Sequence, residues 1–289
     1  SDWSSDVCSS DLLEAMGSGF PDYAERRHLA RAYLRLGQFY HDRGRDRDDW
    51  QGYDWEADLE TATSYLDRVS QAGFPDLYAS GDEEWIFREA LQRRAEINSD
   101  LGNYAVARSY FNSALTDDET DPEDKAWLQY ELARTYVDEF DEYDRRGMIQ
   151  DAVDVYYLAI SVFENVEAYT YPDGTSGEPV DEGRPWAEAL HELIWMSRET
   201  GEFLHWDLGN STEAESVWKE GDAYFAQFET DFSDYALSID EWLYVETLRE
   251  EMDILTMLGE VTGDTAYLTE ADGVADILAG TLAANTLSD

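Results

Sequence analysis

Lysine is nearly absent from this chain of 289 residues, which contains only Lys125 and Lys219. The other 18 of its 20 basic residues are arginines, and they face 66 aspartates and glutamates, so the formal net charge is −46. Nucleic-acid phosphates are bound by clustered lysine and arginine, and an anionic membrane repels a protein this acidic. We therefore expect no nucleic-acid partner and no association with an anionic membrane.

Cysteine and long apolar runs are also scarce. Cys8 is the only cysteine, and it lies in residues 1–12, which we interpret below as a non-native leader, so no intramolecular disulfide, thiolate metal site or cysteine nucleophile is expected. The sequence has no apolar run of about 18 residues, so no helix is expected to insert into a membrane. Hydrophobic residues nevertheless make up 43% of the chain, which is enough to build a folded core.

The acidic residues are spread over both halves of the chain. An acid-rich, lysine-poor composition resembles that of proteins from organisms that keep molar salt around them, where a Debye length of about 3 Å screens self-repulsion. We interpret the acidity as an adaptation to a salty solvent. An acidic protein from ordinary surroundings is the alternative.

This interpretation predicts that thermal stability rises steeply between low salt and molar KCl, because added ions screen the repulsion among surface carboxylates. Melting curves followed by circular dichroism at increasing KCl measure the effect. A melting temperature that does not depend on KCl would contradict the interpretation.

Residues 1–12 have neither a helical period nor a strand alternation, and they lack an initiator methionine. They also resemble translated read-through of a sequencing adapter, so we interpret them as a non-native leader, with a short native leader as the alternative. On this interpretation the chain is a fragment of a longer protein. The cytoplasm of a salt-adapted organism is slightly favoured as its compartment, and an exported or lipoprotein form is compatible with the sequence.

Apolar residues recur at helical spacing from end to end, whereas strand signals are weak. Turn residues separate the apolar stripes in pairs, as Gly102 does between residues 91–101 and 104–115. The segment Gly73–Asp76 repeats Gly19–Asp22 at an offset of 54 residues, and in both copies an apolar helix stops at glycine and proline. The sequence therefore predicts an all-α fold of repeated antiparallel helix pairs.

Residues 101–115 resemble the turn and second helix of a tetratricopeptide repeat, with Leu91 and Ala95 at matching places on the first helix. Proteins of that family stack helix pairs of about 34 residues into a solenoid. The resemblance covers residues 13–164, with an acidic loop expected near 138–147. It implies a tetratricopeptide-like α-solenoid that binds other proteins and carries no chemistry of its own.

The second half of the chain is less regular. Residues 165–185 are rich in proline and glycine and are expected to form a loop that separates two halves of the chain. Residues 186–289 show further helical hairpins, whose arrangement could depart from a regular solenoid. The string Thr262–Ala271 resembles helix-pair turns of α/α-toroid enzymes and lectin-like barrels as much as those of tetratricopeptide repeats.

Catalytic motifs are absent: the sequence contains no P-loop, dinucleotide-binding glycine motif, nucleophile elbow or complete zinc-protease motif. The segment His191–Trp195 begins like the zinc-protease helix but has tryptophan at the position of the second ligand. The clusters of aspartate lack the glycine and glutamate spacing of a calcium-binding loop. We therefore expect no enzymatic activity, no metal and no cofactor.

The tetratricopeptide family binds peptides along its first helices, which line a concave groove. Carried over to this sequence, the groove positions are Gln38, His41, Gln92, Glu96, Trp127, Tyr130, Arg134, His191, Trp195 and Arg198. Aromatic and guanidinium side chains at helical spacing are frequent interface anchors. The alternative to a binding role for Trp127 and Trp195 is that both side chains pack between neighbouring repeats.

Two functions follow from these patterns. The first is a non-enzymatic scaffold that binds a peptide or a partner protein in the concave groove of a helical solenoid. The alternative is a carbohydrate-active or carbohydrate-binding protein of the α/α-toroid type, which the 14% aromatic content favours. The sequence predicts neither the identity of the partner nor the oligomeric state.

Overall fold

A computed structural model of the chain describes residues 23–45, 54–70, 73–80, 83–116, 121–171, 183–239 and 241–285. The expected leader and the first copy of the Gly-Phe-Pro-Asp repeat lie outside these described residues. The described residues form helices and the turns that join them, without a strand, and the chain divides into two compact units, Ser1–Thr120 and Asp121–Asp289.

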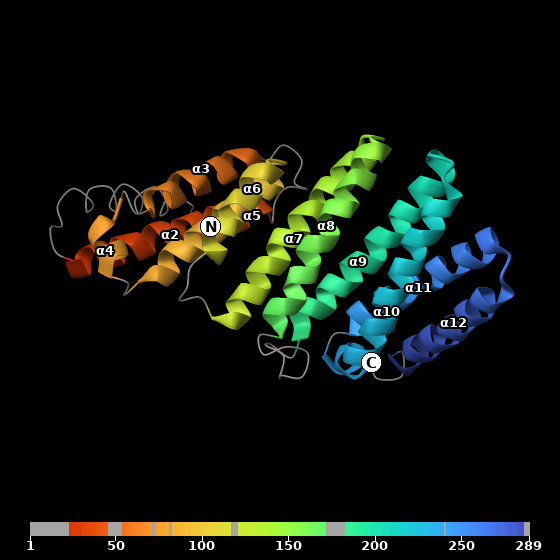
Figure 1. Cartoon of the computed structure of the whole chain (residues 1–289). Coiled ribbons are helices and arrows are strands. Elements are labelled where there is room, and N and C mark those ends of the chain that lie inside the picture. The colour runs from red at the N-terminus through yellow and green to blue at the C-terminus, as the bar shows by residue number, and fades with distance from the viewer. Residues whose placement is uncertain are drawn as a thin grey trace. The chain divides into compact units, whose positions relative to one another are not determined.

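Unit 1 is built from helices that share one apolar core (Figure 1). Its described helices are α2 (Tyr23–Arg45), α3 (Trp55–Arg68), α4 (Pro75–Ser80), α5 (Glu84–Asp100) and α6 (Tyr104–Leu115). α2 packs along α3 and against α5, and α5 pairs with α6. Leu34, Leu59, Leu66 and Ile86 lie in the core because each falls on the apolar stripe of its helix.

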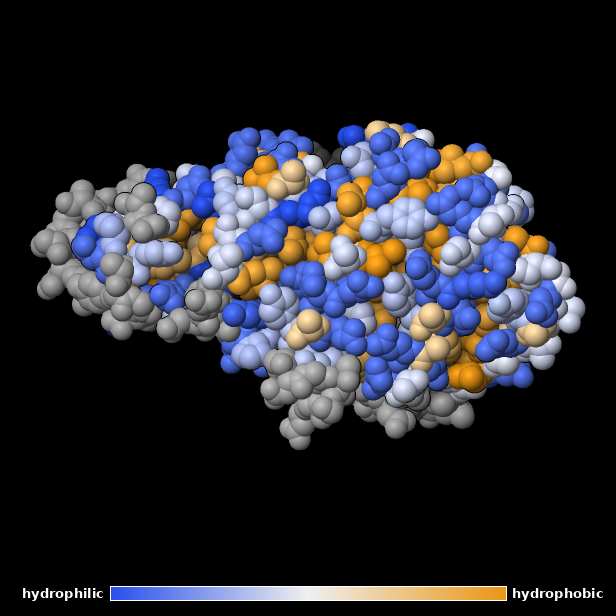
Figure 2. Space-filling view, viewed as in Figure 1, coloured by the Kyte–Doolittle hydropathy of each residue, from blue (hydrophilic) through white to orange (hydrophobic). Residues whose placement is uncertain are grey.

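Unit 2 contains longer helices that follow one another in chain order (Figure 1). They are α7 (Pro122–Arg145), α8 (Ile149–Thr170), α9 (Arg184–Glu202), α10 (Ser211–Ile239), α11 (Glu241–Thr262) and α12 (Thr265–Asn285), with a π-helical turn at Phe203–Asp207. Hydrophilic residues cover much of the visible side of these helices, with apolar residues between them (Figure 2). Each helix packs against the next, and α9 also contacts both α7 and α11. The first helices of successive pairs therefore lie side by side, and the predicted fold of stacked antiparallel helix pairs is confirmed.

The order of packing in unit 2 also bears on the α/α-toroid alternative. In Figure 1, α12 lies at the opposite edge of the unit from α7, and it packs on α11. The described helices of unit 2 thus form an open row. A toroid needs its first and last helix pairs to meet, so this arrangement gives the alternative no support.

Two helix-pair turns fall at predicted glycines. Gly102 has a φ of 72° between α5 and α6, and Gly263 has a φ of 73° between α11 and α12. This left-handed backbone strains a residue with a side chain and is the usual conformation just after a helix end. Asp264 then accepts a hydrogen bond from the amide of Ala266 at 2.9 Å, which caps the start of α12.

The prediction of an acidic loop near residues 138–147 is largely wrong, because α7 continues through Arg145. Phe140 is 1% exposed in the core of unit 2, so packing favours the helix here. Glu142 also pairs with Arg145 at 2.9 Å and with Arg146 at 2.6 Å, one helical turn away. Burial and these pairs together offset the repulsion among neighbouring carboxylates.

The expected loop at 165–185 is also partly helical. α8 continues to Thr170, with Val166 and Thr170 fully buried, and α9 starts at Arg184. The division between the two compact units lies between residues 120 and 121, whereas the sequence suggested one at this loop. The buried side chains at the end of α8 explain why this helix extends into the segment that was expected to be a loop.

Candidate functional site

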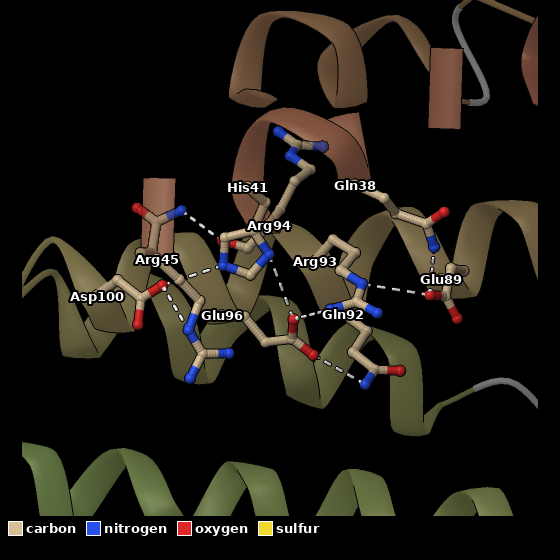
Figure 3. Close-up of polar contacts among 10 residues, drawn as sticks. Gln38, His41, Arg45, Glu89, Gln92, Arg93, Arg94, Glu96 and Asp100 are labelled. Atoms are coloured by element: carbon tan, nitrogen blue, oxygen red, sulfur yellow. Dashed lines mark hydrogen bonds and ion pairs between the residues drawn. The ribbon is translucent and has the colours of Figure 1, made fainter. Parts of the chain in front are cut away.

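Four predicted binding residues of unit 1 meet in one polar network between α2 and α5 (Figure 3). Gln38 Nε2 donates a hydrogen bond to Glu89 Oε1 at 2.8 Å. Arg93 Nη1 donates to Glu96 Oε2 at 2.8 Å, and Gln92 Nε2 donates to Glu96 Oε1 at 2.9 Å. The network joins the first helices of two successive helix pairs.

His41 closes the other end of this network (Figure 3). Its ring is fully buried, with Nε2 at 3.0 Å from Asp100 Oδ2 and Nδ1 at 3.6 Å from Glu96 Oε2. Gln38 is buried as well, at 9% exposure. Because their polar groups pair mainly within the protein, these side chains hold α2 against α5, and we interpret the network as structural.

In unit 2, Trp127, Tyr130 and Arg134 of α7 face α9. Tyr130 is buried and packs edge-on against Trp127, with ring centroids 5.7 Å apart. Arg134 Nε lies 3.9 Å from Glu192 Oε1 of α9, and its side chain is 42% exposed. The three predicted residues therefore do come together, although Tyr130 belongs to the core and Arg134 is the most accessible of them.

His191 and Trp195 of α9 have different surroundings. His191 Nδ1 lies 3.1 Å from the hydroxyl of Thr247, and its ring meets Trp242 of α11 edge-on at 6.2 Å. Trp242 is 66% exposed. Trp195 is partly buried and packs edge-on against Phe140 at 5.5 Å, as the packing alternative for this residue expected.

Arg198 is occupied by carboxylates of its own protein. Its guanidinium donates to Glu199 at 2.6 Å and to Glu202 at 2.9 Å, and it makes a short hydrogen bond to Glu250 of α11. The side chain is 16% exposed. Arg198 therefore joins α9 to α11 and has little capacity left for a ligand carboxylate.

These contacts combine into one surface on α7, α9 and α11, which we call the carboxylate face. It consists of Arg134, Asp138, Asp141, Glu188, His191, Glu192, Arg198, Glu199, Trp242 and Glu250. Its carboxylates outnumber its two arginines. Both arginines are already engaged by these carboxylates, so the face retains an excess of negative charge.

The excess charge alters the titration of the face. Burial raises the pKa of Glu192 to about 7, and repulsion from Asp138 and Asp141 adds to the increase although Arg134 opposes it. Burial, together with neighbouring carboxylates, also raises the pKa of Asp141, Glu199 and Glu250. Burial lowers the pKa of His191 to about 4, so this imidazole is neutral at pH 7 and adds no positive charge.

Seven members of this surface were not among the predicted binding residues: Asp138, Asp141, Glu188, Glu192, Glu199, Trp242 and Glu250. Glu192 directly follows the predicted His191, but nothing in the sequence distinguishes it as a site residue among the 66 acidic residues of the chain. A signal for Trp242 was present, because tryptophan also occurs on the first helices α7 and α9. Extending that pattern to α11 would have found Trp242.

Comparison with known proteins is limited to the fold. No family model and no curated protein matches the chain. Two crystal structures of TPR-like repeats, from a protein described as a kinesin light chain of Podosopora anserina, resemble it at 15% and 16% identity, one of them a single-residue variant. Each alignment covers 88% of this chain and 97% of the other, with a TM-score of 0.41.

The fold is tetratricopeptide-like. The packing within unit 2 carries this conclusion, since helix pairs stack in order and their first helices contact one another. Within the described parts of the chain, no helix is long and apolar enough to cross a membrane. The carboxylate face lies on the first helices of these pairs, α7, α9 and α11.

Proposed function

We propose that this protein is a non-enzymatic scaffold whose carboxylate face binds a basic, partly apolar peptide segment of a partner protein. The observation that carries the proposal is an exposed tryptophan, Trp242, packed against His191, whose neighbour Glu192 lies among carboxylates that the arginines of the same face do not neutralise. Stacked helix pairs offer such a face as a rigid platform.

Charge complementarity supports a basic partner. A carboxylate whose pKa is raised by burial and by like charges gains most from a lysine or arginine placed nearby, because the added cation removes the repulsion. Glu192 is in this position on α9, and Glu250 is in a similar one on α11. A partner that carries glutamate or phosphate would meet repulsion at the same places.

An aromatic anchor supports the apolar part of the partner. Trp242 packs one edge on His191 and leaves two-thirds of its surface open, at 66% exposure. Tryptophan at the centre of an interface is often worth about 2 kcal/mol or more, because a large area is desolvated on binding. An aliphatic side chain of the peptide, next to its basic residues, would cover this ring.

Replacing Trp242 with alanine is expected to weaken binding of a basic peptide by about tenfold or more, since the anchor is lost. The probe is a labelled extended peptide that interleaves lysine with leucine, and titration followed by fluorescence anisotropy gives its dissociation constant. The same peptide with glutamate in place of lysine is expected not to bind.

Trp206 offers a matched control for this experiment. It is 63% exposed, in the π-helical turn after α9, and it does not belong to the carboxylate face. The Trp206→Ala variant should bind the basic peptide as the unchanged protein does. Equal weakening by both substitutions, or equal binding of the lysine and glutamate peptides, would contradict the proposal.

The raised pKa of Glu192 adds a pH dependence to the same titration. A cationic peptide prefers the ionised carboxylate, so its affinity is expected to increase from pH 6 to pH 8 as Glu192 loses its proton around pH 7. The Glu192→Gln variant should lose most of this pH dependence. An affinity that falls over the same range would argue against carboxylates as the contacts.

A further inference from the structure

A chain of hydrogen bonds connects α9 to α11 beside the exposed Trp242. The Nδ1 atom of His191 lies 3.1 Å from the hydroxyl oxygen of Thr247, and that hydroxyl donates to the backbone carbonyl oxygen of Leu243 at 2.7 Å. Because Thr247 is fully buried, its hydroxyl depends on partners within the protein. The ring of His191 is therefore held in one orientation at the carboxylate face.

The chain also fixes which nitrogen of His191 carries a hydrogen. A hydroxyl has a single hydrogen, and the 2.7 Å between Thr247 Oγ1 and the Leu243 carbonyl oxygen is a hydrogen-bond distance, so that hydrogen points at Leu243. Toward His191 the hydroxyl oxygen can then only accept, which places a hydrogen on Nδ1. Burial lowers the pKa of His191 to about 4, so the ring is neutral at pH 7 and its other nitrogen, Nε2, is a hydrogen-bond acceptor.

Nε2 of His191 is an unused acceptor. Among the described residues it has no hydrogen-bond or ion-pair partner, and it is not one of the unpaired side-chain atoms that are sealed from solvent. The centroid of the exposed Trp242 ring lies 6.2 Å from that of His191. A peptide side chain that covers Trp242 also displaces water from the neighbouring ring, and an acceptor that loses its water without gaining a donor weakens binding. A well-fitting peptide therefore brings an N–H group to this place.

A main-chain N–H group of the peptide suits this acceptor. The ionised carboxylates of the face only accept hydrogen bonds, so they cannot pair with Nε2, and they attract the lysine side chains of the peptide to themselves. An extended peptide leaves its main-chain N–H groups unpaired. Its residues i and i+2 lie about 7 Å apart, close to the 6.2 Å between the centroids of His191 and Trp242. A peptide that covers Trp242 thus passes His191 within about two residues.

We propose that His191 recognises the main chain of the bound peptide: its Nε2 accepts a hydrogen bond from one main-chain N–H group next to the side chain that covers Trp242. This inference rests on the proposed function and adds a requirement to it, because neither charge nor apolar contact selects for an N–H group. The partner segment is extended, since a helix uses most of its N–H groups internally. Proline cannot occupy the donating position, because it has no N–H group.

N-methylation of one peptide amide at a time tests this hydrogen bond, since it removes a single donor and leaves the charge unchanged. A lysine-rich peptide with one central leucine serves as the parent, because only one side chain can then cover Trp242. Fluorescence anisotropy at pH 7 gives the dissociation constants. We expect one N-methyl position to raise the dissociation constant about tenfold, because Nε2 of His191 is then covered and unpaired. The His191→Phe variant has no acceptor, so it should bind the parent peptide about tenfold more weakly and show no further loss at that position.

Failure of this inference is distinguishable from failure of the proposed function. A His191→Phe variant that binds the parent peptide as tightly as the unchanged protein does would overturn the inference alone. The same conclusion would follow if every N-methyl derivative lost equal affinity for both proteins. A parent peptide that does not bind the unchanged protein at all would overturn the proposed function, and this inference with it.

His205 provides a matched control. Its Nδ1 atom lies 2.9 Å from the hydroxyl oxygen of Ser211, and its ring meets the exposed Trp206 edge-on with centroids 4.2 Å apart. His205 therefore has a hydroxyl and a tryptophan as neighbours, as His191 does, but it lies outside the carboxylate face. The His205→Phe variant should bind the parent peptide as the unchanged protein does, and weakening equal to that of His191→Phe would overturn the inference.

The position of the hydrogen on His191 is tested without a peptide. Heteronuclear NMR of the labelled imidazole at pH 7 should show a hydrogen on Nδ1 and none on Nε2, and the opposite arrangement would overturn the inference. Thr247→Val keeps the shape of the side chain but removes the oxygen that holds this hydrogen, so it should weaken peptide binding several-fold. Thr247→Ser retains the hydroxyl and should restore the affinity. Equal affinities of the valine and serine variants would argue against a role for the hydrogen-bond chain and overturn the inference.

Discussion

Replacing Gly201 with alanine is expected to lower the free energy of unfolding of unit 2 by about 2–5 kcal/mol. A Cβ atom at Gly201 would lie 2.1 Å from Nε1 of Trp218 and 2.4 and 2.5 Å from the neighbouring ring carbons. Trp218 is fully buried, so its ring cannot move aside without disturbing the core. Its Nε1 also donates to the carbonyl oxygen of Arg198 at 3.2 Å, and a displaced ring would lose this hydrogen bond.

Urea titration followed by near-ultraviolet circular dichroism measures this effect, because the signal reports the packing of tryptophan. Gly273→Ala is the matched control: Gly273 is exposed on α12, and a Cβ there meets nothing within 4 Å. Alanine at that position should stabilise the helix by about 0.5–1 kcal/mol. Similar small effects of both substitutions would show that α9 and α10 do not approach as closely as described.

Replacing Arg198 with methionine is expected to cost about 3–5 kcal/mol at pH 8 and low salt. The substitution keeps most of the apolar stem and removes the guanidinium that Glu199, Glu202 and Glu250 share. These carboxylates would then repel one another between α9 and α11 while largely shielded from water. The loss should shrink as pH falls toward 5, since the pKa values of Glu199 and Glu250 are raised already and would rise further without the cation.

Thermal melts of the Arg198→Met variant across pH test this expectation. Arg249→Met provides the control, because Arg249 is 48% exposed and its one ion pair among the described residues is with Glu246 of its own helix. An exposed pair of this kind contributes at most about 1 kcal/mol. An Arg198→Met variant that is as stable as Arg249→Met would mean that Arg198 is available to a ligand, as the sequence suggested.

The helices were predictable because their evidence is local. The apolar stripes that bury Leu34 and Leu59 are visible within one or two turns of sequence, as are the glycine turns at Gly102 and Gly263. The exception is the end of α7, where a run of acidic residues suggested a loop. Phe140 makes that segment helical by packing against Trp195, more than 50 residues away in the chain.

The candidate site was predictable only in part. The tetratricopeptide resemblance placed Gln38, His41 and Arg198 on first helices, and they lie on α2 and α9. Spacing does not say what covers a helix face, and each of these side chains is engaged by a residue 51 to 59 positions away: Glu89, Asp100 and Glu250.

By itself, the sequence determined the helical content, the pairing of helices through short turns, and a net charge of −46, because each is a property of composition or of neighbouring residues. Only the tertiary structure decided which of the 66 acidic side chains are exposed, neutralised or buried. The solvation of a carboxylate depends on the helices packed around it, and those come from distant parts of the chain. For this reason the carboxylate face emerges only when the helices are assembled.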